Sequence, residues 1–124
     1  MNYQFIVDFI KQTDTVTTES GLMYRVIEGS DGVPPSTENK VKVHHKISLV
    51  DGTVVDDTYE NEQPDEFDIE EAIDGLQEGL QLMPTGARYE FVIPPELAWG
   101  KEGNGSKVGP QHYMVMDVKL LSYA

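Results

Sequence analysis

Residues 75–86 read GLQEGLQLMPTG, a short helical pattern with glycines at 75 and 79 that ends in the turn Pro84-Thr85-Gly86. With the residues before it, this stretch predicts a helix over residues 70–82, because Ile73, Leu76 and Leu80 share one stripe. Each glycine costs a helix about 1 kcal/mol relative to alanine. We therefore expect these glycines to mark a close backbone approach or a surface that faces a ligand.

The rest of the chain predicts a small antiparallel sheet around this helix. Residues 41–50 alternate between apolar and polar side chains, which is the period of a strand, and a strong hairpin signal, Asp51-Gly52, follows them. A short amphipathic helix is predicted within the first dozen residues. The other strand patterns lie at residues 22–27, 53–56, 67–69, 87–93 and 113–121. The predicted fold is α+β, with an antiparallel sheet of about five strands wrapped around one short α-helix.

Composition limits the classes of function. The chain has 124 residues, of which 39% are hydrophobic, and this is enough for one globular domain. The absence of cysteine excludes thiol chemistry, disulfides and zinc–thiolate sites. The net charge of −13 argues against nucleic acid and anionic membrane surfaces as partners, since both need a basic footprint. No apolar run approaches the ~18 residues of a membrane span.

Negative charge is concentrated in the middle of the chain. No lysine or arginine occurs between Lys46 and Arg88. Two interpretations are open: a solvated acidic surface, or an electrostatic field that favours cationic or unfolded basic partners. The acidic residues of this segment are Asp51, Asp56, Asp57, Glu60, Glu62, Asp65, Glu66, Asp68, Glu70, Glu71, Asp74 and Glu78.

The common signatures of enzyme chemistry are missing. The adjacent His44 and His45 point to opposite faces of a strand and cannot easily share a metal ion. Asp51, Asp56 and Asp57 lie near one turn but lack the spacing of a calcium-binding loop. No nucleophile elbow, phosphate-binding glycine loop or HExxH motif occurs. What remains is an apolar pocket between sheet and helix. Such a pocket can accelerate rotation about an X-Pro bond by binding the twisted amide better than the planar one.

Several segments carry more specific motifs. They read VHHKISLVDGTVVDDTY at residues 43–59, AIDGLQEGL at 72–80, IPPELAWG at 93–100 and VMDVKLL at 115–121. In this order and spacing they resemble the FKBP-type peptidyl-prolyl cis-trans isomerases. The segment TTESGLMY at residues 17–24 resembles the start of that domain in bacterial Mip-like members. The resemblance implies an isomerase domain over residues 18–124, preceded by a helical remnant and linker over residues 1–17.

The resemblance also implies a site. Its catalytic residues are Asp56, Ile73 and Trp99, and the position of Ile73 donates its backbone N–H to the substrate carbonyl. Trp99 stands where the family has tyrosine, so an indole N–H replaces a phenol O–H as donor. The implied substrate-binding residues are His45, Val55, Ala72, Leu76, Val108 and Met116.

The implied pocket has lost aromatic walls. Four of its positions are aromatic in the family: His45, Val55, Leu76 and Met116. Each lost ring removes about 0.5–1.5 kcal/mol of contact beyond simple burial. We therefore expect a shallower or wider pocket that is still apolar.

The main hypothesis is a peptidyl-prolyl cis-trans isomerase of reduced activity that acts on proline-containing polypeptides or unfolded proteins during folding. The alternative is a non-catalytic chaperone or protein-binding module with the same fold. We expect only weak binding of FK506-like macrolides, no cofactor, no metal, no nucleic acid and no membrane insertion. A dimer is expected only through a longer N-terminal region. The first residues lack a secretory leader, and the compartment stays open between the bacterial cytoplasm and periplasm.

Overall fold

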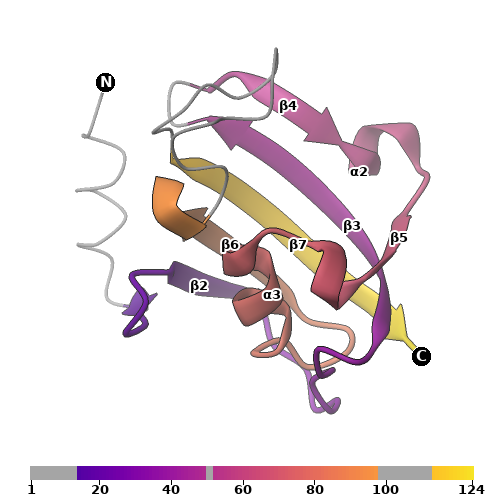
Figure 1. Cartoon of the computed structure of the whole chain (residues 1–124). Helices are drawn as coiled ribbons and strands as arrows, with labels where there is room; N and C mark the ends of the chain where they lie inside the picture. The colour runs from indigo at the N-terminus through magenta and orange to yellow at the C-terminus, as the bar shows by residue number, and fades with distance from the viewer. Residues whose placement is uncertain (1–13, 50–51, 98–112) are drawn as a thin grey trace.

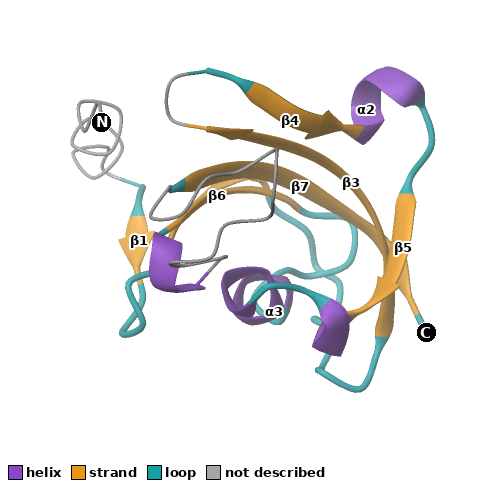
Figure 2. Cartoon of the chain, turned by 45° about the horizontal axis from the view of Figure 1, so that its top comes forward, coloured by secondary structure: helices purple, strands orange, loops and turns teal. Residues whose placement is uncertain are grey.

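The structure of the chain is a computed structural model that describes residues 14–49, 52–97 and 113–124. Its main element is one antiparallel sheet that curves around a short helix, α3 (Asp74–Leu80), as Figures 1 and 2 show. This arrangement confirms the predicted α+β fold class. The sheet has seven strands: β1 (Val16–Thr17), β2 (Met23–Glu28), β3 (Lys40–Leu49), β4 (Val54–Asp57), β5 (Asp65–Asp68), β6 (Arg88–Ile93) and β7 (Met114–Tyr123).

The strand order is β1-β2-β6-β7-β3-β4, and β5 also pairs with β3. The long strand β3 makes this possible, because β4 pairs with its second half and β5 with its first half. Six of these strands correspond to strand patterns in the sequence, and the two-residue β1 was not predicted. The predicted N-terminal helix lies outside the described residues. The predicted division into residues 1–17 and 18–124 stays a prediction.

The predicted helix over residues 70–82 is wrong in extent. A 3-10 turn, η1 (Ile69–Glu71), comes first, and the next two residues, Ala72 and Ile73, are extended with ψ angles of 163° and 153°. The Gln77 side chain stabilises this break, because its Nε2 donates a hydrogen bond to the Ala72 carbonyl oxygen at 2.8 Å. The period of the apolar side chains continues through the break, so the sequence pattern does not reveal it.

Two further short helices were not predicted. α2 (Thr58–Asn61) follows β4, and the Asp57 side chain caps it by accepting a hydrogen bond from the Glu60 N–H at 3.2 Å. η2 (Pro95–Leu97) follows β6. None of the helices in the described ranges is long and apolar enough to cross a membrane.

The glycines of α3 pack directly against the sheet. A Cβ atom at Gly75 would lie 2.6 Å from Cγ2 of Ile93, and one at Gly79 would lie 2.7 Å from Cε1 of Phe91. Ile93 and Phe91 are fully buried. Any side chain at the two glycines would therefore push α3 away from the core, and the role found for the glycines is close backbone approach.

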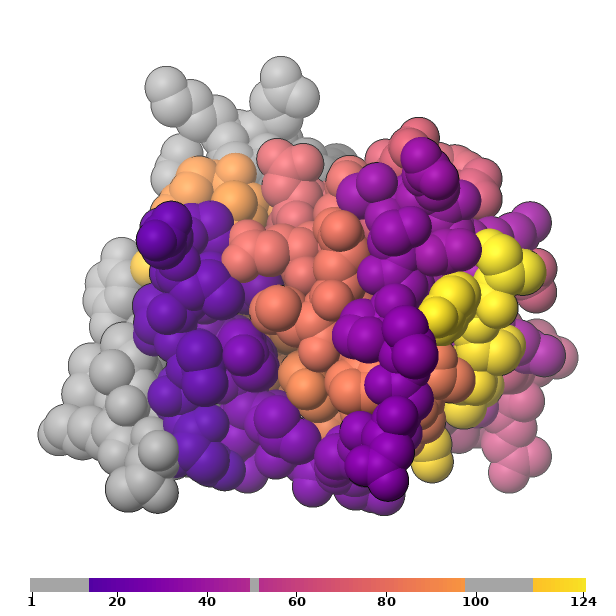
Figure 3. All heavy atoms as spheres, turned by 90° about the horizontal axis from the view of Figure 1, so that it is seen from below, coloured from indigo at the N-terminus to yellow at the C-terminus, as the bar shows by residue number. Residues whose placement is uncertain are grey.

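The segment that follows β2 is hydrogen-bonded to the turn that precedes β6. Figure 3 shows this segment lying across the surface beside the residues that precede β6. The Ser30 hydroxyl donates to the Thr85 carbonyl oxygen, and the Thr85 hydroxyl donates to the Val33 carbonyl oxygen at 3.3 Å. Gly86 then adopts a φ of 93°, which favours glycine, and its N–H donates to Leu120 O at 2.8 Å.

Candidate active site

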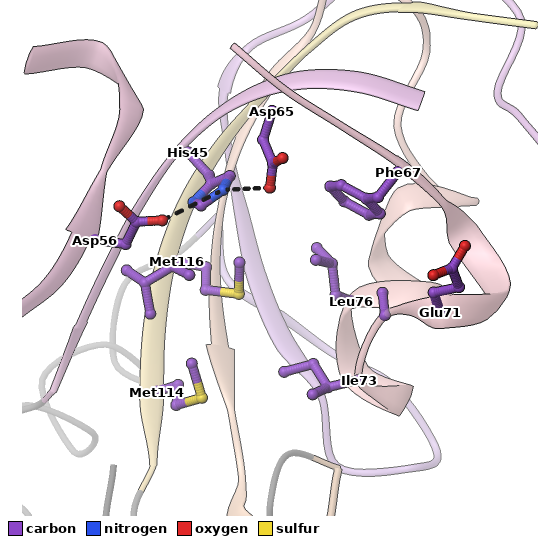
Figure 4. Close-up of a pocket in the computed structure, with 11 residues that line it drawn as sticks. His45, Asp56, Asp65, Phe67, Glu71, Ile73, Leu76, Met114 and Met116 are labelled. Atoms are coloured by element: carbon purple, nitrogen blue, oxygen red, sulfur yellow. Dashed lines mark hydrogen bonds and ion pairs between the residues drawn. The ribbon is translucent and has the colours of Figure 1, made fainter. Parts of the chain in front are cut away.

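A cavity of about 430 Å³ lies between the sheet and the segment that runs from η1 into α3 (Figure 4). Its walls come from β3, β4, β5, η1, α3 and β7. The cavity is therefore formed by the packing of the sheet against the helix and not by any single segment of the chain. Six of the predicted site residues line it: His45, Asp56, Ala72, Ile73, Leu76 and Met116.

The other three predicted residues have different positions. Val55 lies on β4, is half-buried and does not line the cavity, because successive side chains on a strand alternate and its neighbour Asp56 faces the cavity. Trp99 and Val108 lie outside the described residues. Their assignment to the site stays a prediction.

The sequence analysis missed five residues that line the cavity: Ile47, Asp65, Phe67, Glu71 and Met114. The two-residue period of strands could have found two of them. Ile47 follows His45 by two residues on β3, and Met114 precedes Met116 by two on β7. Phe67 lies on β5, where no site residue was predicted. Asp65 and Glu71 carry no comparable signal, because many acidic residues flank them in the sequence.

The break before α3 leaves a backbone donor at the cavity. Ile73 is the N-cap of α3, and its carbonyl oxygen accepts hydrogen bonds from the N–H groups of Leu76 and Gln77, both at 3.0 Å. No described residue accepts a hydrogen bond from the N–H of Ile73. The first N–H groups of a helix have no partner within the helix. A ligand carbonyl in the cavity could accept this hydrogen bond.

His45 connects two carboxylates at the mouth of the cavity. Its Nε2 lies 3.3 Å from Asp65 Oδ2 and 4.0 Å from Asp56 Oδ2 (Figure 4). The residue is only 4% exposed, and its Nδ1 is buried without a partner in the described part of the chain. Because Nε2 faces two acceptors, it carries the proton of the neutral ring. This N–H donates to Asp65, and the Asp56 carboxylate lies beside it, beyond hydrogen-bond distance.

The backbone of His45 is held by α2. The His45 N–H donates to the Thr58 hydroxyl oxygen at 2.8 Å, and that hydroxyl donates to the His45 carbonyl oxygen at 3.3 Å. The next residue, Tyr59, donates its hydroxyl to Asp117 Oδ1 at 2.8 Å on the far side of the sheet. Arg88 completes this cluster with two hydrogen bonds to Asp117, at 2.8 and 2.7 Å. Burial, followed by the hydrogen bond and the charge of Asp117, raises the pKa of Tyr59.

The third carboxylate of the cavity is Glu71, and it has another acid beside it. The Asp68 carboxyl group raises the pKa of Glu71, first by sharing a hydrogen bond and then by its negative charge. Within the described residues, no cluster of three or more His, Asp or Glu side chains has a geometry that could hold a metal ion.

The site is thus a mainly apolar cleft with one backbone donor and a carboxylate rim, the combination of apolar walls and a few polar groups that is typical of ligand-binding pockets. The family model of the FKBP-type peptidyl-prolyl cis-trans isomerases matches residues 32–121. The chain therefore belongs to this family.

Individual relatives agree with the family match. Over 118 residues, the chain is 39% identical to a probable FKBP-type peptidyl-prolyl cis-trans isomerase of Haemophilus influenzae, covering 95% of this chain and 49% of that protein. It is 38% identical to the FKBP-type 22 kDa peptidyl-prolyl cis-trans isomerase of Escherichia coli over 118 residues, covering 95% of this chain and 57% of that one. The chain therefore spans about half the length of these relatives.

Solved structures share the fold. The crystal structure of FkpA from Escherichia coli superposes with a TM-score of 0.91 at 35% identity, covering 97% of this chain and 56% of that one. The crystal structure of AtFKBP13 superposes with a TM-score of 0.80 at 27% identity, covering 89% of this chain and 98% of that one.

Proposed function

We propose that this domain is a peptidyl-prolyl cis-trans isomerase that accelerates rotation about X-Pro bonds in polypeptides. The observation that carries the proposal is the mainly apolar cavity of about 430 Å³ with six of the predicted site residues on its walls. Family membership and the names of the relatives support the same activity.

The chemistry needs no acid, base or cofactor. Amide resonance sets the barrier to X-Pro rotation at about 18–20 kcal/mol, and the twisted amide at the top of the barrier has lost this resonance and is less polar. A cavity with walls of Ile47, Phe67 and Leu76 removes water from the amide and so favours the twisted state over the planar one.

Hydrogen bonds would hold the substrate in place. In this proposal the N–H of Ile73 donates to the carbonyl oxygen of the peptide. The Asp56 carboxylate accepts a hydrogen bond from a peptide N–H at the mouth. Trp99 adds an indole N–H donor, as the family resemblance implies. These groups fix one side of the X-Pro bond while the other side rotates.

The proposed activity is lower than that of family members with aromatic pockets. Among the described residues that line the cavity, Phe67 is the only phenylalanine, tyrosine or tryptophan. Fewer ring contacts hold the prolyl ring and the twisted amide less firmly. For the same reason we propose weak binding of FK506-like macrolides. Dimerisation is proposed only for a longer chain with additional N-terminal residues.

The test is the rate of cis-to-trans conversion of proline tetrapeptides, together with refolding of a protein whose slow phase is proline isomerisation. Acceleration in either assay is expected at micromolar concentrations of the domain. No acceleration in both assays would overturn the isomerase proposal. If peptides bind without acceleration, the domain is instead the non-catalytic binding module.

The pocket argument has its own test. Replacing Leu76 by Trp adds a ring to the cavity wall and should raise kcat/KM about two- to tenfold, from a gain of about 0.5–1.5 kcal/mol in ring contacts. The matched control is Leu82→Trp, because Leu82 is 37% exposed and lies outside the cavity. An unchanged rate for a folded Leu76→Trp variant would count against the argument.

A further inference from the structure

The charged side chains around the cavity are all acidic in the described residues, apart from the histidine between them. They are Asp56, Asp65 and Glu71, and none of the described lysines and arginines lines the cavity. The side chains of Asp56 and Asp65 are 48% and 52% exposed, so both reach the solvent at the mouth. An incoming peptide therefore meets negative charge before it meets the apolar walls.

Strand alternation explains why the lysines of β3 and β7 do not line the cavity. On β3, His45 and Ile47 face the cavity, so the intervening Lys46 faces the other side of the sheet. On β7, the same alternation turns Asp117 and Lys119 away from the cavity that Met116 lines. The side chains of Lys46 and Lys119 therefore lie on the face of the sheet opposite the cavity.

The imidazole of His45 cannot neutralise the rim. In its neutral form it offers one N–H, on Nε2, which donates to Asp65 and lies 4.0 Å from Asp56. In its protonated form it carries one positive charge against these two carboxylates. Glu71 has no basic partner within 4 Å among the described residues and lies beside another acid, Asp68. Either form of the ring leaves an excess of negative charge.

We propose that the cavity selects X-Pro segments that carry lysine or arginine next to the proline, so the domain acts on basic stretches of unfolded chains. This inference rests on the proposed function. The prolyl ring fills the apolar cavity, and the aliphatic stem of a lysine or arginine lies along the wall and brings its charge to Asp56 and Asp65. The cavity binds the prolyl ring, and the carboxylates raise the affinity for peptides that also carry a lysine or arginine.

The same charges steer the encounter. A cleft lined by one sign of charge raises the local concentration of oppositely charged ligands, and salt screens this effect. Selectivity for basic segments should therefore depend on ionic strength, whereas recognition of the prolyl ring by apolar contact should not.

The experiment compares the peptides Ala-Lys-Pro-Phe, Ala-Leu-Pro-Phe and Ala-Glu-Pro-Phe, with both kcat/KM for isomerisation and Kd for binding measured. At about 20 mM salt we expect the lysine peptide to exceed the glutamate peptide about tenfold in both quantities. At about 500 mM salt, where the Debye length is only about 4 Å, the ratio should fall toward one. Equal values at low salt would overturn the proposal.

Variants locate the source of the selectivity. Asp65→Asn with Glu71→Gln removes two charges and keeps an acceptor beside His45, and it should lower the lysine-to-glutamate ratio by at least about threefold. The control is Glu66→Gln, because Glu66 lies next to Asp65 but pairs with Lys40 at 3.7 Å and does not line the cavity. An equal change in the ratio for both variants would overturn the assignment to the cavity rim.

The two proposals fail separately. Acceleration of all three peptides without a preference leaves the isomerase function and overturns the selectivity. A preference in Kd without acceleration of any peptide leaves the selectivity and overturns the catalysis.

Discussion

The two faces of the sheet differ in how their charged side chains are arranged. On the outer face, which points away from α3, charges of opposite sign are paired: Arg88 binds Asp117 through two hydrogen bonds, and Arg25 binds Glu90 at 3.0 Å. On the helix face, which packs against α3, apolar side chains such as Phe91 form the core. The carboxylates at its margin have no lysine or arginine partner among the described residues.

Along each strand, alternate side chains therefore belong either to the outer face with its ion pairs or to the helix face with the core and the cavity. Paired charges on the outer face keep the sheet soluble and contribute little stability per pair. The helix face supplies most of the stability through burial and also contains the cavity. The carboxylates at the margin of the helix face therefore lie where a ligand is expected, and the predictions below alter one face at a time.

The largest effect is expected from adjacent residues of β6 on opposite faces. Phe91→Ala leaves a cavity in the core and should lower the free energy of unfolding by about 3–5 kcal/mol. Glu90→Ala removes only a surface ion pair and should cost less than about 1 kcal/mol. Urea denaturation measures both. If Phe91→Ala does not fold, Phe91→Leu replaces it, and a cost no larger than that of Glu90→Ala would contradict the comparison.

A smaller effect is expected where α3 touches the helix face. Gly79→Ala places a Cβ atom 2.7 Å from the Phe91 ring and should lower the free energy of unfolding by about 1–3 kcal/mol, despite the better helix propensity of alanine. Gly29→Ala is the control, because no atom lies within 4 Å of its added Cβ. Urea denaturation measures the free energy of unfolding of both variants. If Gly79→Ala is as stable as Gly29→Ala, the contact with the Phe91 ring can relax.

The backbone donor at the cavity can be removed without breaking the helix. Ile73 has a φ of −60° at the N-cap of α3, and proline adopts this φ and lacks the N–H. Ile73→Pro should lower kcat/KM about two- to tenfold relative to Ile73→Ala, since a hydrogen bond contributes about 0.5–1.5 kcal/mol. Ile73→Ala is the control for the lost side chain. If the two variants have equal kcat/KM values for the tetrapeptides, the N–H of Ile73 does not contribute to catalysis.

The smallest effect concerns the outer face at high pH. Tyr59→Phe removes the hydrogen bond to Asp117 and should lower the free energy of unfolding by about 1 kcal/mol at neutral pH. The pKa of folded Tyr59 is raised above that of the unfolded chain, about 10, so its contribution is present below pH 10 and declines above it. Urea denaturation at pH 9 and pH 11 should therefore show a narrowing gap between wild type and variant. A constant gap would contradict the raised pKa.

Local patterns predicted much of the fold. The alternation over residues 41–50 corresponds to β3, and two residues of the predicted apolar stripe, Leu76 and Leu80, are buried on α3, whereas Ile73 is the N-cap of that helix. Such patterns succeed because one buried face imposes the period of its own secondary structure. They failed at Ala72, where a side-chain hydrogen bond from Gln77 interrupts the helix without changing the period.

The candidate site was predicted in part. The family resemblance placed Asp56 and Leu76 in the site, and both line the cavity, but it also included Val55, which does not. It omitted Asp65, although this residue is the nearer acceptor of His45. A motif gives residue types at given spacings, whereas the lining of a cavity depends on how β4 and β5 pair with β3.

By itself, the sequence determined the α+β class, the family, the absence of cysteine chemistry and the concentration of acid between Lys46 and Arg88. Its two glycines in the helix indicated either a close backbone approach or a surface that faces a ligand, and the packing against Ile93 and Phe91 decided for the first. The tertiary structure alone decided which carboxylates of that acidic segment reach the cavity. The physical reason is that strand pairing is a long-range event: the register of β3 with β4 and β5 brings Asp56 and Asp65 to the same imidazole.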